Sequence, residues 1–149
     1  MALDGWYYLH TNGDLIFKRD FGETAADIRE SPFARGLWPV NVGDREGAWN
    51  ILVEALAGGA RPDRITELAA KWGCNDTDAQ VYAERVGCQL QRDGSAWHAS
   101  RKDFIDLQAS PNGFGATALE AMAALAKELG YQPAKMWGQS FKQLLAVAA

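Results

Sequence analysis

The side chains best suited to a soft metal ion in this 149-residue chain are Cys74, Cys88, His10 and His98. Structural zinc sites use four such ligands, commonly with cysteines paired at short spacing. Here the two cysteines are fourteen residues apart. Cys88 and His98 fall in an expected hairpin whose register points them to opposite faces. We therefore expect no metal site and no other cofactor.

Residues that could act as a nucleophile or a base are also scattered. Ser140 lies in the run Gly138-Gln139-Ser140-Phe141, which lacks the closing glycine of a nucleophile elbow. No pair among the nineteen acidic residues has a spacing that demands general acid–base chemistry. Since no constellation supplies both a nucleophile and a base, we expect a protein that is not an enzyme.

A glycine-rich segment offers a candidate anion site. Gly113, Phe114 and Gly115 lead into an expected helix whose first turn follows Thr117. Backbone N–H groups and the positive end of the helix dipole can hold an anion at such a place. Neither the dinucleotide fingerprint nor the P-loop spacing is present. We favour the alternative of a tight turn whose donors are satisfied by a capping box of Thr117 and Glu120.

The segment 61–99 reads as helix, short turn, helix and hairpin, an order that resembles a winged helix-turn-helix. Ala69 and Gly73 match the small residue and the turn glycine of such motifs. In this interpretation the helix over 77–86 would enter the major groove of DNA. The turn at 93–94 would be the tip of the wing.

The charge of this unit argues against DNA. The expected recognition helix and its leading turn contain Asp76, Asp78 and Glu84 against Arg85 alone. DNA-binding proteins place cations there, because affinity comes largely from neutralised phosphates. DNA binding remains the alternative function, and its candidate contacts are the four nearby cations Arg85, Arg92, Arg101 and Lys102.

Two hairpins and about five helices are expected, which gives a single α+β domain over 1–149. The first hairpin spans about 6–18. With Asn12 and Gly13 as a two-residue type I′ turn, Tyr8 lies opposite Phe17. The second spans about 88–99 around the turn at 93–94, which places Leu90 opposite Trp97. Helical spacing predicts helices over 44–57, 62–72, 77–86 and 117–129, and a last helix from about 134. Residues 24–30 could form either a helix or a strand. We expect an extended segment over 101–108 and a loop over 110–115.

Composition indicates a globular protein that works in a reducing compartment. The net charge is −4, and residues 1–60 hold five basic and nine acidic side chains. An acidic half of this kind opposes long-range attraction to nucleic acid and to anionic membranes. Two cysteines are too few for a disulfide framework, and neither a signal peptide nor an apolar run long enough to span a membrane is evident. We expect a cytoplasmic protein with no membrane partner.

Two resemblances add context. The opening Trp6-Tyr7-Tyr8 with Asn12-Gly13 resembles the start of GYF-type domains, which dock proline-rich peptides, but Arg19-Asp20-Phe21-Gly22 stands where those domains carry Gly-Pro-Phe. The segments 6–18, 48–58, 67–74 and 104–115 resemble uncharacterised small proteins of tailed phages and prophages of proteobacteria. That resemblance implies an accessory protein made in a bacterial cytoplasm.

The function expected from these observations is non-enzymatic binding of a macromolecular partner, and a protein is the partner that we favour. The candidate surface is the acidic N-terminal half with its aromatic hairpin. An exposed Trp6 or Trp38 would support that surface, because tryptophan is enriched at binding hot spots.

Overall fold

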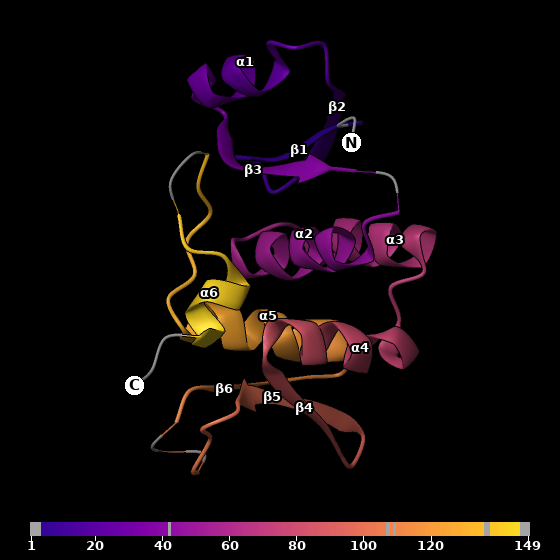
Figure 1. Ribbon diagram of the computed structural model, residues 1–149, viewed down its shortest axis with the longest axis vertical. Coiled ribbons are helices and arrows are strands. Elements are labelled where there is room, and N and C mark those ends of the chain that lie inside the picture. Colours follow the sequence, from indigo (N-terminus) through magenta and orange to yellow (C-terminus); the bar gives the residue numbers. More distant parts are fainter. Residues whose placement is uncertain (1–3, 42, 107, 109, 136–137, 147–149) are drawn as a thin grey trace.

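The computed structural model describes residues 4–41, 43–106, 108, 110–135 and 138–146. Helix α1, a sheet, helices α2 and α3, helices α4 and α5, and a second sheet follow one another along the longest axis (Figure 1). The expected α+β class with two hairpins is confirmed, and the described residues form six helices rather than about five. The strands are β1 (Gly5–His10), β2 (Leu15–Arg19), β3 (Ala34–Val40), β4 (Cys88–Asp93), β5 (Ala96–Arg101) and β6 (Asn112–Gly115); the helices are α1 (Thr24–Glu30), α2 (Arg45–Ala57), α3 (Pro62–Trp72), α4 (Asp76–Val86), α5 (Ala118–Glu128) and α6 (Phe141–Ala146).

The N-terminal sheet has the antiparallel order β2-β1-β3. Its hairpin pairs Tyr7 with Phe17, so the expected pairing of Tyr8 with Phe17 is wrong by one residue. The cause is the turn. Gly13 takes a positive φ of 90° whereas Asn12 does not, and a type I′ turn needs a positive φ at both. The loop instead has three residues, closed by the bond from the His10 N–H to the Asp14 carbonyl.

Helices α2, α3 and α4 begin and end largely where their local signals predict. The Asp44 carboxylate caps α2 by accepting from the Gly47 N–H, and Pro62 opens α3. Gly73 ends α3 in the left-handed conformation that favours glycine. Helix α4 begins one residue earlier than expected, because the Asn75 side chain, not Thr77, caps it.

The C-terminal sheet has the antiparallel order β4-β5-β6. Its hairpin turns at residues 94–95, so Leu90 pairs with Ala99 and not with Trp97. This shift of two residues keeps every side chain on its expected face, because side chains alternate with a period of two. Cys88 and His98 accordingly lie on opposite faces, as predicted.

Strand β6 corrects the expected loop at 110–115. Residues 112–115 pair with β5, and the two glycines of β6 pack against α5. A Cβ on Gly113 would lie 2.4 Å from the Leu125 backbone nitrogen, and one on Gly115 would lie 2.6 Å from that of Ala121. Glycine is therefore needed here for close packing of the strand on the helix.

Two other expectations fail in the C-terminal part. Phe104 lies beyond the end of β5 and is not in a strand, and Leu107, expected as its companion anchor, lies outside the described residues. Helix α6 begins at Phe141 and not at about 134; the Ala134 carbonyl accepts a hydrogen bond from the Leu37 N–H of β3. A single cluster of buried side chains extends from Tyr7 in the N-terminal sheet to Trp97 in the C-terminal sheet.

Candidate functional site

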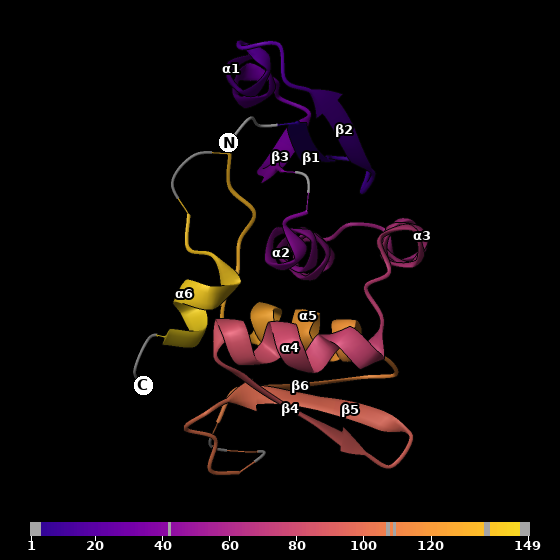
Figure 2. The ribbon, with the colours of Figure 1, turned by 45° about the vertical axis from the view of Figure 1, so that its right-hand side comes forward.

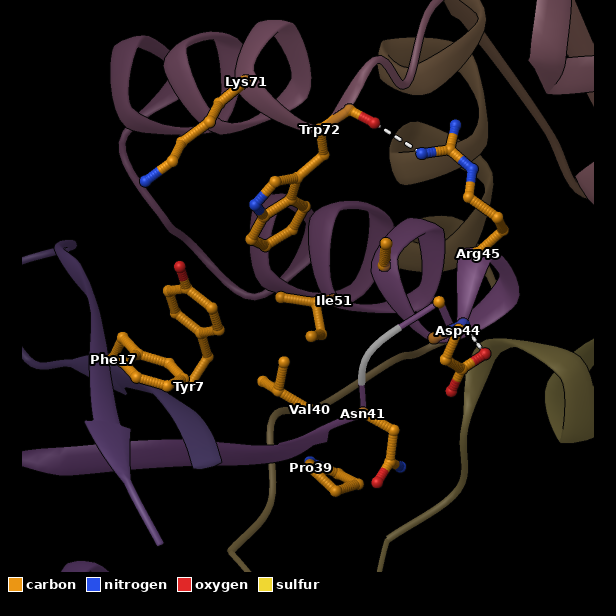
Figure 3. Close-up of a pocket in the computed structure, with 13 residues that line it drawn as sticks. Tyr7, Phe17, Pro39, Val40, Asn41, Asp44, Arg45, Ile51, Lys71 and Trp72 are labelled. Carbon is orange, nitrogen blue, oxygen red and sulfur yellow. Dashed lines mark hydrogen bonds between the residues drawn. The ribbon is translucent and has the colours of Figure 1, made fainter. Parts of the chain in front are cut away.

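A groove of about 460 Å³ lies between the N-terminal sheet and helices α2 and α3 (Figure 3). We call it the aromatic groove. Its floor is apolar, with Val40 from β3 and Ile51 from α2, and its polar residues come from the start of α2 and the end of α3. The side chains that define it are Tyr7, Phe17, Pro39, Val40, Ile51, Lys71 and Trp72.

Three aromatic rings from three elements form one side of this groove. The Tyr7 ring of β1 lies 5.3 Å from the Phe17 ring of β2 and 5.3 Å from the Trp72 ring of α3, edge-on to the latter. Tyr7 is buried, whereas Phe17 keeps 42% of its surface exposed at the mouth. Tilted and edge-to-face arrangements are the ones that aromatic pairs prefer, and they stabilise the relative positions of the rings. The groove therefore offers a preformed apolar wall.

Burial raises the pKa of the Tyr7 hydroxyl, and the nearby charge of Arg64 offsets only part of that rise. The phenol therefore remains neutral at physiological pH. Its contribution to the groove is a ring face and a neutral hydroxyl.

Three charged residues lie at the polar rim of the groove: Asp44, whose carboxylate caps α2, Arg45, and Lys71. The Arg45 guanidinium donates to the carbonyls of Trp72 and Gly73 and lies 2.7 Å from the Asp78 carboxylate. It thereby ties the end of α3 to α4. Lys71 is exposed and has no ion pair with any described residue. Lys71 is thus the lining cation that can meet a charge from outside.

The sequence reasoning missed this groove. It placed Tyr7 and Phe17 on opposite faces of the hairpin, because the expected register was one residue out. The helix expected over 62–72 ends at Trp72, which is half-buried and faces the groove. No local signal links the end of α3 to the hairpin.

Neither of the tryptophans whose exposure would support a binding surface is exposed. Trp38 is buried at 7% exposure and its indole N–H donates to Glu54. Trp6 is half-buried, with its indole nitrogen enclosed and without a hydrogen-bond partner among the described residues. The exposed aromatic rings of the N-terminal half are instead Phe17, Phe21 and Phe33.

Of the four cations proposed for DNA, three are exposed and one is buried. Arg85, Arg92 and Lys102 are exposed, and Arg92 lies over the ring of Trp97. Arg101 is buried, with its Nε 3.3 Å from the Asp103 carboxylate. Helix α4 packs between α2 and β4, with its acidic first turn joined to Arg45 and to α5.

Backbone N–H groups of the proposed anion site already donate to side chains of this protein. The Ala118 N–H, in the first turn of α5, donates to the Asp76 carboxylate at 2.9 Å, and the Glu120 N–H donates to the Thr117 hydroxyl. The glycines before them belong to β6 and pack on α5. The arrangement agrees with the capping alternative and leaves Asp76 in the place an external anion would take.

A second hollow, of about 740 Å³, lies on the outer face of the C-terminal sheet. There the His98 ring is flanked by Phe104 and Phe114, at 5.0 and 4.6 Å between ring centres. The described lining contains no serine or cysteine that His98 could activate. Across the part of the chain that the structure describes, no three His, Cys, Asp or Glu residues converge to hold a metal ion.

Comparison with known proteins returned no match to a family model, to a curated protein or to a solved structure. Among the described helices, none has the length and apolar character needed to cross a lipid bilayer.

Proposed function

We propose that this protein is a non-enzymatic binding protein and that the aromatic groove receives a segment of another protein. The observation that carries the proposal is the wall of Tyr7, Phe17 and Trp72, which is fixed in place and open to solvent at Phe17. Aromatic side chains in partly enclosed positions are the groups that contribute most to binding at protein interfaces.

A protein segment fits the groove better than a small molecule for a geometric reason. Phe17 keeps 42% of its surface exposed at the mouth and belongs to the edge strand β2, so apolar surface continues beyond the enclosed part of the groove. A small ligand held inside would leave that surface in water. A longer segment would cover both the wall and the mouth, and each Å² of apolar surface removed from water contributes roughly 25 cal/mol.

The test is selection of peptides from a random twelve-residue phage library against the protein, followed by calorimetry with the synthetic peptides. Phe17→Ala is the groove variant. Phe114→Ala is its matched control, because Phe114 is exposed to 45% but lies on the opposite sheet. We expect Phe17→Ala to weaken binding about tenfold or more, equivalent to about 1.4 kcal/mol, and Phe114→Ala to leave it unchanged. Failure to select any peptide, or equal affinities for all three proteins, would refute the proposal.

The alternative of DNA binding is tested by the fluorescence anisotropy of a labelled duplex at low and at physiological salt. Binding that weakens steeply with salt would show that phosphates are neutralised, and would favour DNA over a protein partner. We expect no such binding, because Arg101 is buried beside Asp103 and the expected recognition helix with its leading turn carries Asp76, Asp78 and Glu84 against Arg85 alone. As an accessory protein of a phage or prophage, the protein would act on a component of the phage or of its bacterial host.

A further inference from the structure

The two edges of the N-terminal sheet differ in how far the chain itself covers them. On β3, the outward Leu37 N–H donates to the Ala134 carbonyl at 3.2 Å, and the next outward residue, Pro39, has no N–H to offer. This edge is therefore closed by the segment before α6 and by a proline, two common ways of protecting a sheet edge.

On the β2 edge, outward backbone groups at both ends of the strand have hydrogen-bond partners, whereas those in the middle do not. In an antiparallel pair, alternate residues of an edge strand direct both backbone groups outwards, and on β2 these are Leu15, Phe17 and Arg19. The Leu15 carbonyl accepts two hydrogen bonds from Arg64, at 3.0 and 3.1 Å. The Arg19 carbonyl accepts one from the Thr24 hydroxyl at 3.0 Å. Within the described part of the chain, the outward N–H and C=O of Phe17 have no partner.

Helix α3 lies beside α2 on the β2 side of the sheet (Figure 2). Arg64 is near its start and fixes the helix to the edge at Leu15. Lys71 follows two turns later on the same side of the helix, about 10 Å along its axis. Phe17 is about 7 Å along the strand from Leu15, and both Phe17 and Lys71 line the aromatic groove. A chain paired with β2 at Phe17 would therefore pass within reach of the Lys71 ammonium.

We propose that the partner segment binds as a short extra strand. Its backbone pairs with the N–H and C=O of Phe17, an apolar side chain enters the aromatic groove against Tyr7 and Trp72, and an acidic side chain meets Lys71. This inference rests on the proposed function and specifies the partner as an extended, acidic-apolar segment. Recognition by strand addition takes affinity from the backbone and specificity from alternate side chains.

Hydrogen exchange of single amides tests the strand pairing, with a selected peptide that depends on Phe17 as the probe. The Phe17 N–H points outwards and the Lys18 N–H points to β1, so the neighbouring amide is the internal control. We expect exchange of Phe17 to slow at least tenfold in the complex while that of Lys18 stays slow in both states. Methylation of one peptide amide nitrogen should weaken binding about tenfold or more.

Charge exchange tests the acidic position. Lys71→Glu should weaken binding of the same peptide about tenfold, and replacing the acidic residue of the peptide by lysine should restore it. Lys102→Glu, on the other half of the molecule, should have no effect.

If peptides that require Phe17 leave its amide exchange unchanged and tolerate methylation at every amide, strand addition is wrong and the groove remains a binding site. If binding requires Phe17 but not the charge at position 71, the acidic partner is wrong. If no selected peptide requires Phe17, the proposed function itself fails.

Discussion

Replacing Glu54 by glutamine tests how the two halves of the molecule are joined. Glu54 lies in α2 at 5% exposure and has no ion pair among the described residues. One carboxylate oxygen accepts from the Trp38 indole at 2.8 Å and from the Tyr131 hydroxyl at 3.4 Å; the other accepts from the Phe141 N–H at 2.8 Å. The side chain thus links β3, the segment after α5 and the start of α6.

Burial raises the pKa of the Glu54 carboxyl, and the three hydrogen bonds, from Phe141, Trp38 and Tyr131, lower it only in part. The folded state therefore binds the proton more tightly than the unfolded state, in which the pKa is about 4.3. The stability contributed by this group is fully present below that value and is lost as pH rises through the folded pKa. Glutamine does not titrate, so it lacks this pH dependence.

The stability lost in Glu54→Gln depends on how many of the surrounding hydrogen-bond donors the new side chain can still accept from. A protonated carboxyl oxygen can donate to the Tyr131 hydroxyl while still accepting from Trp38, so the acid form keeps all three partners. The glutamine NH₂ group cannot accept, so either the Trp38 or the Phe141 N–H is left buried without a partner. That loss costs about 1–3 kcal/mol. At higher pH the wild type must ionise Glu54 in its buried position, whereas glutamine stays neutral. The loss of unfolding free energy caused by Glu54→Gln therefore becomes smaller, by about 1.4 kcal/mol for each pH unit by which folding raises the Glu54 pKa.

Urea unfolding followed by tryptophan fluorescence, at pH values from about 4.5 to 8, measures this difference. We expect Glu54→Gln to be less stable than the wild type by about 1–3 kcal/mol at the acid end, with a smaller deficit at pH 8. Glu84→Gln on the exposed side of α4 is the control, and should change stability by less than about 0.5 kcal/mol at any pH. A deficit that grows with pH would mean that the fold favours the carboxylate. No deficit at any pH would mean that the hydrogen bond lost on substitution, from the Trp38 or the Phe141 N–H, contributes nothing to stability.

Three further measurements examine the packing and capping described above. Gly113→Ala should destabilise by about 1–3 kcal/mol in thermal unfolding, because the new Cβ would lie 2.4 Å from the Leu125 backbone nitrogen; unchanged stability would show that β6 can move away from α5. Asp76→Ala should cost about 1 kcal/mol in urea, because it removes the acceptor of the Ala118 N–H; an equal cost for Asp76→Asn would show that the carboxylate charge is needed. Burial raises the pKa of the Cys88 thiol to about 12, so Ellman's reagent at pH 8 should modify it only after unfolding, and rapid reaction of the native protein would contradict its burial.

Local signals in the sequence predict most element ends correctly. Asp44, Pro62 and Gly73 start or stop helices as expected, because each acts on backbone groups within a turn of itself. The roles of β6 and Glu54 could not be predicted in this way. Strand β6 depends on two glycines meeting the backbone of α5. Glu54 is satisfied by donors sixteen, seventy-seven and eighty-seven residues away.

The aromatic groove depends on a single turn residue. Had Asn12 adopted the positive φ of a type I′ turn, the two strands would pair one residue out of step and Tyr7 and Phe17 would point to opposite faces. The three-residue loop places the positive φ on Gly13 alone, where glycine adopts it at no steric cost. Its register brings Tyr7 and Phe17 to the same face, the one that Trp72 of α3 contacts. A change of one residue in the length of this surface loop would therefore place Tyr7 and Phe17 on opposite faces and remove the groove, with the composition of both strands unchanged. For that reason the composition of the hairpin alone did not predict the groove.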